Sequence, residues 1–104
     1  MLTDTLRKDI EKTIHDNKIV FYMKGTLQAP MCGFSGRVAQ ILQSYNQPIK
    51  AINILEDENI RQGIKEFSNW PTIPQIYIKG EFIGGCDIVT EMHDSGELKK
   101  LLSA

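Results

Sequence analysis

One of the two cysteines stands where a protein chain activates a thiol. Cys32 follows a predicted buried strand and its exit loop, and it precedes a predicted helix. The free N–H groups and the positive dipole end of a helix start stabilise a thiolate, which is the reactive form of cysteine. Lys24, at the end of the strand, adds a positive charge nearby. A buried apolar cysteine is the common alternative, but the position between Pro30 and Gly33 argues against burial.

The residue three places after this cysteine limits the chemistry. A dithiol redox site has the pattern Cys-x-x-Cys, whose second thiol resolves a mixed disulfide. Here the four residues are Cys32-Gly33-Phe34-Ser35, and a serine hydroxyl does not attack a disulfide as a thiolate does. Cys32 can therefore form a mixed disulfide with an external thiol, or it can serve as a single open metal ligand.

The segment Thr72-Ile73-Pro74 precedes another predicted strand. A cis proline here would turn the Ile73 backbone outward beside Cys32, with an N–H and a C=O free to pair with an extended peptide. On physical grounds alone an ordinary trans proline is favoured, because only about 5% of X–Pro bonds are cis.

The segment Gly84-Gly85-Cys86-Asp87 ends the last predicted strand and opens a helix. Paired glycines allow a ligand to approach the backbone closely. The N–H groups of Cys86 and Asp87 can hold a carboxylate, and the Asp87 side chain can hold an ammonium group. The α-carbon end of an amino acid carries both a carboxylate and an ammonium group, so it would fit this segment. A glycine turn followed by an N-cap aspartate accounts for the segment equally well.

Four other residues have side chains that occur in binding sites. Arg61 follows an apolar position on a predicted helix, and a solvated charge is the simpler interpretation. His15 and His93 lack metal-ligand spacing, so we assign them no role. Trp70 is assigned to packing rather than to stacking on a ligand.

The elements that must position these residues follow one another closely. Predicted strands cover residues 19–23, 49–54, 75–78 and 82–84, and the last two form a hairpin. Helices are predicted over residues 3–17, from Cys32 to about 46, from the acidic run 56–58 to about 67, around 88–92 and around 98–102. The second helix is expected to turn one apolar side inward, made of Phe34, Val38, Ile41, Leu42 and Tyr45.

This order, α-β-α-β-α-β-β-α-α, predicts an α/β fold. The first strand–helix–strand unit implies a parallel pair with a right-handed crossover. A four-stranded mixed sheet with helices on both faces is the compact solution. All 104 residues are expected to form a single domain.

Composition excludes several classes of protein. The formal net charge of −1 argues against a nucleic-acid partner. No apolar run approaches the roughly 20 residues that cross a bilayer, and the N-terminal residues show no apolar core of a secretory signal. Two cysteines do not make a disulfide scaffold. We therefore expect a cytoplasmic protein with reduced thiols and no membrane partner.

Four segments together resemble the monothiol glutaredoxins of the CGFS type, which belong to the thioredoxin-fold superfamily. They are Met23-Lys24-Gly25-Thr26, Pro30-Met31-Cys32-Gly33-Phe34-Ser35, Trp70-Pro71-Thr72-Ile73-Pro74-Gln75 and Gly80-Glu81-Phe82-Ile83-Gly84-Gly85-Cys86-Asp87. They span most of the chain in the family's order. The family commonly has proline after Lys-Gly-Thr, where this chain has Leu27, so that loop is expected to be less constrained.

The resemblance implies a thioredoxin-like fold and a glutathione groove beside Cys32. If the roles known in the family apply to the matching positions of this chain, Lys24 and Arg61 would face the glycine carboxylate of glutathione. The Ile73 backbone would pair with its cysteine residue, with Pro74 cis. Cys86 and Asp87 would hold the γ-glutamyl end.

The resemblance also implies a [2Fe–2S] cluster bridging a homodimer, and a role in cluster assembly and transfer to apo-acceptor proteins. Such a centre usually takes four thiolates. Cys32 from each of two chains and two bound glutathiones would supply them. The rival function is a glutathione-dependent thiol–disulfide oxidoreductase that deglutathionylates proteins with Cys32 alone, so enzymatic activity is left open. A protein-binding adaptor switched by the cluster is a third alternative.

Overall fold

The computed structural model describes residues 2–103, which form one four-stranded sheet and its covering helices. The strands are β1 (Ile19–Met23), β2 (Lys50–Asn53), β3 (Gln75–Ile78) and β4 (Glu81–Gly84). The helices are α1 (Asp4–Asp16), α2 (Gly33–Gln43), α3 (Glu58–Ser68), α4 (Cys86–Ser95) and α5 (Glu97–Ser103), with a short 3-10 helix, η1 (Ile54–Glu56). The predicted order of elements is confirmed, and η1 is an addition to it.

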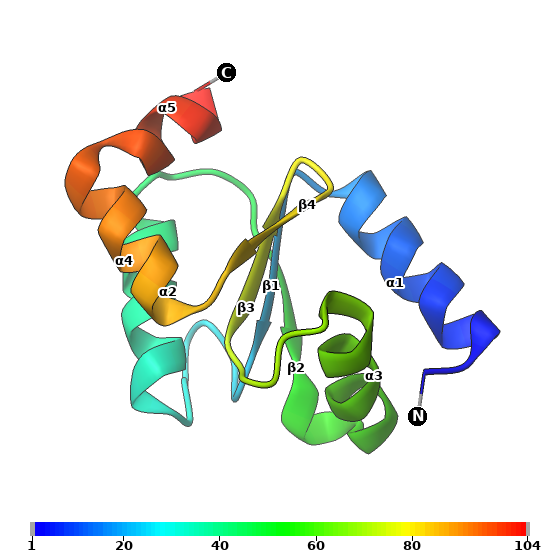
Figure 1. Ribbon diagram of the computed structural model, residues 1–104. Coiled ribbons are helices and arrows are strands. Elements are labelled where there is room, and N and C mark those ends of the chain that lie inside the picture. The colour runs from blue at the N-terminus through cyan, green and yellow to red at the C-terminus, as the bar shows by residue number, and fades with distance from the viewer. Residues whose placement is uncertain (1, 104) are drawn as a thin grey trace.

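The sheet is mixed, with the strand order β2-β1-β3-β4 (Figure 1). Strand β1 pairs in parallel with β2, as the crossover argument predicts, and antiparallel with β3. Strands β3 and β4 form the predicted hairpin. Because β1 and β3 are antiparallel, the end of β1 lies beside the start of β3. Lys24, which follows β1, and Pro74, which precedes β3, therefore lie at the same end of the sheet.

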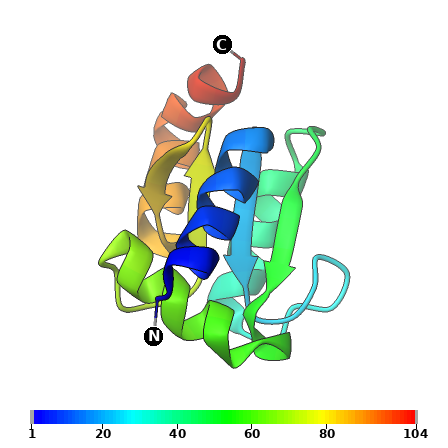
Figure 2. The ribbon, with the colours of Figure 1, turned by 90° about the vertical axis from the view of Figure 1, so that its right-hand side faces the viewer.

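Helices cover both faces of the sheet, with α1 and α3 on one side and α2 and α4 on the other (Figures 1 and 2). The apolar run of β1 serves both sides because successive side chains of a strand point to opposite faces. Ile19, Phe21 and Met23 join the core under α2, α4 and α5. Val20 and Tyr22 join the core under α1 and α3. This is why the strand reads as five consecutive apolar residues.

Three local expectations were wrong. The Phe34 side chain is 62% exposed rather than turned inward, because it lies in the first turn of α2, where it lines a surface groove and not the core. Helix α2 ends at Gln43, before the expected boundary at residue 46. Ile54, expected in a strand, is buried as the first residue of η1.

The N-termini of α1 and α3 are capped by side chains. The hydroxyl of Thr3 accepts a hydrogen bond from the N–H of Leu6 at 3.1 Å. The Asp57 carboxylate accepts from the first free N–H groups of α3. Among residues 2–103, no helix is long and apolar enough to cross a membrane.

Candidate functional site

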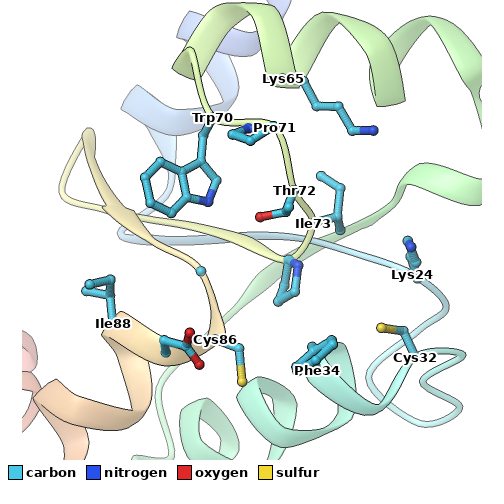
Figure 3. Close-up of a pocket in the computed structure, with 13 residues that line it drawn as sticks. Lys24, Cys32, Phe34, Lys65, Trp70, Pro71, Thr72, Ile73, Cys86 and Ile88 are labelled. Carbon is cyan, nitrogen blue, oxygen red and sulfur yellow. The ribbon is translucent and has the colours of Figure 1, made fainter.

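A groove of about 480 Å³ opens at one end of the sheet. Its walls come from four parts of the chain: the end of β1 with the start of α2, the second half of α3, residues 70–74, and the start of α4 (Figure 3). Cys32 and Lys24 lie together on one side, and Cys86 and Ile88 lie on the other. All four segments that carry the family resemblance therefore contribute residues to this one groove.

Cys32 is the N-cap residue of α2, with its backbone in the extended region. The N–H of Ser35 lowers the pKa of the Cys32 thiol, and the N–H of Phe34, the charge of Lys24 and the Ser35 hydroxyl lower it further. Partial burial acts in the opposite direction. Because the net direction is downward, the fold favours the thiolate at this position, as the sequence predicts.

Ser35 has a structural role that the sequence did not reveal. Its side chain is completely buried, and its hydroxyl oxygen accepts a hydrogen bond from the Lys24 N–H at 3.1 Å. The same hydroxyl stabilises the Cys32 thiolate. Ser35 thus connects the end of β1 to the reactive thiol, in addition to replacing a resolving cysteine.

The peptide bond between Ile73 and Pro74 is cis, which is the geometry that the family resemblance implied. The Ile73 side chain is buried in the core under α1 and α3, while Ile73 and Pro74 both line the groove. Sequence reasoning missed Gln75, which is fully buried. Its amide donates to the carbonyls of Trp70 and Thr72, at 3.1 and 3.3 Å, and so fixes the turn.

Gly85, rather than Asp87, is the N-cap of α4. A Cβ at Gly85 would lie 3.2 Å from the Pro74 carbonyl oxygen and 3.6 Å from the Trp70 indole nitrogen. The absence of a side chain there allows α4 to begin against the 70–74 segment. Cys86 and Asp87 follow in the first turn, and both line the groove. The Cys86 sulfur lies 3.9 Å from the Thr90 hydroxyl.

The cationic residues of the groove differ from those expected. Lys24 lines it as predicted, and Lys65 of α3, which sequence reasoning missed, also lines it. Arg61 is not among the lining residues, and its guanidinium lies 3.5 Å from the Glu58 carboxylate. Lys65 is one helical turn beyond Arg61, so the i+4 spacing on α3 was the available signal. Within residues 2–103, neither lysine forms a salt bridge.

Large apolar side chains are exposed around the thiol. Met31 and Phe34, on either side of Cys32 in the chain, are 71% and 62% exposed, and Trp70 and Ile88 are each 37% exposed. Trp70 also packs on Phe82, with ring centroids 5.6 Å apart. Trp70 therefore combines the expected packing with a place in the groove wall.

The described residues contain no group of three or more Cys, His, Asp or Glu side chains that could hold a metal ion. His93 hydrogen-bonds to the Tyr45 hydroxyl through Nδ1 at 2.7 Å, and neither His15 nor His93 lines the groove.

Comparison with known proteins agrees with this arrangement. The glutaredoxin family model matches residues 19–83. The chain is 54% identical to the chloroplastic monothiol glutaredoxin-S14 of Arabidopsis thaliana over 95% of its own length, and 49% identical to the probable monothiol glutaredoxin 2 of Rickettsia conorii over 100%. The solution structure of reduced apo GrxS14 from poplar is 50% identical and superposes with a TM-score of 0.80, covering 95% of this chain and 94% of that one.

The extent of these matches differs between relatives. The chain spans 57% of the Arabidopsis protein and 97% of the Rickettsia protein, and it spans between 59% and 64% of three other relatives of about 50% identity. The match to the Rickettsia protein covers the whole chain and therefore every groove residue, whereas the family model ends before Gly85. With one cysteine and one serine in its Cys32-to-Ser35 motif, the chain belongs to the glutaredoxin family, among the monothiol glutaredoxins.

Proposed function

We propose that this protein binds glutathione in the groove and, as a homodimer, carries a [2Fe–2S] cluster that it delivers to acceptor proteins. Glutathione is an extended tripeptide with a carboxylate at each end and an ammonium group at one. The groove has matching polarity, because Lys24 and Lys65 line one part of it and Asp87 another. This polarity, together with family membership, supports the choice of ligand.

The orientation follows from the charges. The glycine carboxylate would lie against Lys24 and Lys65, and Arg61 stays a predicted third cation there. The γ-glutamyl carboxylate would lie at the N–H groups of Cys86 and Asp87, with the ammonium group on the Asp87 side chain. The backbone of Ile73 would pair with the central residue of the ligand.

The cluster is proposed as cargo held between two chains. Cys32 is one half-exposed thiol with a lowered pKa, which suits a thiolate ligand. The described part of one chain offers no complete metal-ligand group, so a second chain and two glutathione thiolates would complete the set of four. The exposed side chains of Met31 and Phe34 provide an apolar rim on which two copies could meet.

The observation that carries this proposal is the single activated thiol at the rim of a groove with opposite charges at its ends. The test is anaerobic reconstitution with iron, sulfide and glutathione, followed by analysis of the purified dimer. Iron, sulfide and glutathione should be present in equal numbers per subunit. A cluster that assembles without glutathione would contradict the proposal.

Two cysteine variants make this test specific. Cys32→Ser should abolish the cluster, because the missing thiolate belongs to the protein. Cys86→Ser is the matched control, since Cys86 lines the same groove but contributes backbone N–H groups in this proposal. Loss of the cluster in Cys86→Ser with glutathione still bound would show that the ligand set is wrong.

The lowered pKa of Cys32 also favours a second candidate function, the reduction of protein–glutathione mixed disulfides. The Cys32 thiolate would attack the glutathione sulfur and release the protein thiolate. A second glutathione would then attack the Cys32 mixed disulfide, which frees Cys32 and leaves glutathione disulfide. Turnover by a colourless monomer would support this enzyme, and a coloured, glutathione-dependent dimer would support the carrier.

A further inference from the structure

The position of Lys24 is fixed by main-chain hydrogen bonds on both sides of the residue. Its N–H donates to the Ser35 hydroxyl at 3.1 Å, and its carbonyl accepts from the Met31 N–H at 2.9 Å. The next N–H, that of Gly25, donates to the Asn53 side-chain oxygen at 3.0 Å. Asn53 lies on another strand, and no motif in the sequence pointed to it.

Asn53 is well placed to serve as an anchor. It is the last residue of β2 and pairs with Met23, the last residue of β1. The same side-chain oxygen also accepts a hydrogen bond from the Leu55 N–H at 3.0 Å and caps η1. One oxygen thus ties the start of the loop to the end of a neighbouring strand and to the turn that follows it.

The loop after Lys24 is closed on itself. Gly25 bridges to Pro30, and Thr26 and Ala29 exchange main-chain hydrogen bonds at 3.2 and 3.1 Å. Lys24 stands at the start of this loop, so the groups that hold the start of the loop in place determine where Lys24 lies. Ser35 attaches it on the side of Cys32, and Asn53 attaches it on the side of the sheet.

We propose that Asn53 is a positioning residue, which holds the Lys24–Gly25 segment so that the Lys24 ammonium faces the groove and the carboxylate of a bound glutathione. This inference rests on the proposed ligand. An uncharged amide suits the task, because its oxygen accepts two N–H groups without placing an anion beside the cationic part of the groove. Asn53 acts through Lys24 and does not itself line the groove.

Binding measurements on a double-mutant cycle test this role. Calorimetry would compare the unmodified protein, Asn53→Ala, Lys24→Ala and the double variant with glutathione. Asn53→Ala should weaken binding several-fold, since a misplaced charge loses part of a charge-assisted hydrogen bond. If Asn53 acts through Lys24, the double variant should bind no more weakly than Lys24→Ala alone.

The probe γ-glutamylcysteine separates positioning from general damage, because it lacks the glycine carboxylate. Asn53→Ala should bind it as tightly as the unmodified protein does. Thr3→Ala is the matched control: it removes an uncharged N-cap acceptor from α1 and should change neither affinity. Additive losses in the double variant, or an equal loss for both probes in Asn53→Ala, would overturn the inference.

A measurement without any ligand distinguishes a failure of this inference from a failure of the proposed function. The main-chain NMR signals of Lys24 and Gly25 should shift in Asn53→Ala, and the Gly25 N–H should exchange faster with solvent because it loses its acceptor; neither should change in Thr3→Ala. Unchanged Lys24 signals in Asn53→Ala would overturn the positioning role. A failure of the unmodified protein to bind glutathione, with these changes present, would instead refute the proposed function alone.

Discussion

At the scale of single residues, Cys32 owes its activation mainly to the helix start that it caps. The N–H of Ser35 is the largest influence that lowers the pKa of the Cys32 thiol, ahead of the charge of Lys24. A main-chain N–H group keeps its place whatever side chain follows Cys32. The fold itself therefore supplies most of the thiolate stabilisation, and side chains adjust it.

Removing the Ser35 hydroxyl should raise the pKa of Cys32. Ser35→Ala deletes a donor that stabilises the thiolate, so the neutral thiol persists to higher pH and alkylation at neutral pH becomes slower. It also leaves the Lys24 N–H without its partner, at a cost of about 1–3 kcal/mol in stability. The measurement is the rate of iodoacetamide alkylation against pH.

The control for this change is Ser68→Ala, which removes a hydroxyl that bonds to the Ile64 carbonyl at 2.9 Å, within α3. Its alkylation profile should match that of the unmodified protein. A Ser35→Ala profile with an unchanged midpoint would mean that the hydroxyl contributes nothing to the thiolate.

The two charged parts of the groove should respond differently to the two ligand probes. Lys65→Ala should weaken binding of glutathione but leave γ-glutamylcysteine unaffected, because the lost contact is to the glycine carboxylate. Asp87→Ala should weaken both, because both carry the γ-glutamyl ammonium group. Losses of about tenfold correspond to about 1.4 kcal/mol, within the range of partly buried charged contacts.

These variants also test the holo dimer. Added glutathione should lengthen the cluster lifetime in Lys65→Ala and Asp87→Ala by mass action, and it should not restore Cys32→Ser. If Asp87→Ala distinguished between the two probes and Lys65→Ala did not, the ligand would lie in the opposite direction.

Most of the candidate site was predictable from residue types, and the exceptions have physical reasons. Cys32, Lys24 and Asp87 stand at ends of elements, where sequence patterns are informative. Lys65 was missed because a lysine in mid-helix usually has no partner but water. Neither composition nor periodicity could reveal Asn53, since its partner Gly25 is distant in sequence and the contact depends on strand pairing.

At the scale of elements, the loop between β1 and α2 depends on one glycine. Gly25 has a φ of +93°, a region that residues with a Cβ rarely adopt. A Cβ there would also lie 2.5 Å from the Ala29 carbonyl oxygen and 2.6 Å from the Met31 nitrogen. The loop between Lys24 and Cys32 therefore requires glycine at position 25 for two independent reasons, the backbone conformation and the lack of space for a Cβ.

Gly25→Ala should consequently destabilise the protein more than a glycine substitution that suffers only from backbone strain. Gly80→Ala is the matched comparison, because Gly80 has a φ of +81° and no atom within 4 Å of an added Cβ. Backbone strain costs about 1–2 kcal/mol in both, and the clash adds about 1–3 kcal/mol in Gly25→Ala. Urea unfolding measures the difference, and equal midpoints would contradict it.

The types of the elements were easier to predict than their ends. The β1 run, the hairpin turn and the acidic start of α3 each carry a local chemical signal that the structure confirms. Phe34 was misassigned because helical periodicity identifies one face of α2 but does not show that the first turn of this face borders a groove rather than the core. Helix α2 ends at Gln43, and a turn follows at residues 44–46, where Ser, Tyr and Asn could equally continue a helix.

At the scale of the whole molecule, two cores share the central strands. Ile76 and Ile78 of β3 face the core under α2, α4 and α5, whereas Tyr77 faces the core under α1 and α3. Strand β1 alternates in the same way. Because both cores depend on the same backbone, damage to one side should weaken the other.

Variants on opposite faces should therefore give the same kind of unfolding curve. Leu98→Ala on α5 and Ile64→Ala on α3 each remove a side chain with no exposed surface, at a cost of about 2–5 kcal/mol. Near-ultraviolet and far-ultraviolet circular dichroism should report one coincident transition in each variant. Two separate transitions in either variant would show that the faces unfold independently.

The sequence predicts the global topology because short connections leave few choices. A β-α-β unit is right-handed and a two-strand hairpin is antiparallel, so the order of elements almost determines the sheet. Spacing in the sequence alone could not predict that one groove brings together residues 24, 32, 65, 74 and 87. It depends on how far each helix extends past the sheet, which side-chain packing decides.

The sheet order has a consequence for the newly synthesised chain. Cys32 emerges from the ribosome well before residues 70–87, which form the far wall of its groove. Strand β1 also lacks its antiparallel neighbour β3 until then. For that interval the nascent chain displays a thiol without the groove that selects its ligand. The reactive thiol is thus encoded in the first third of the polypeptide. The residues that restrict which ligand reaches it are encoded in the last third.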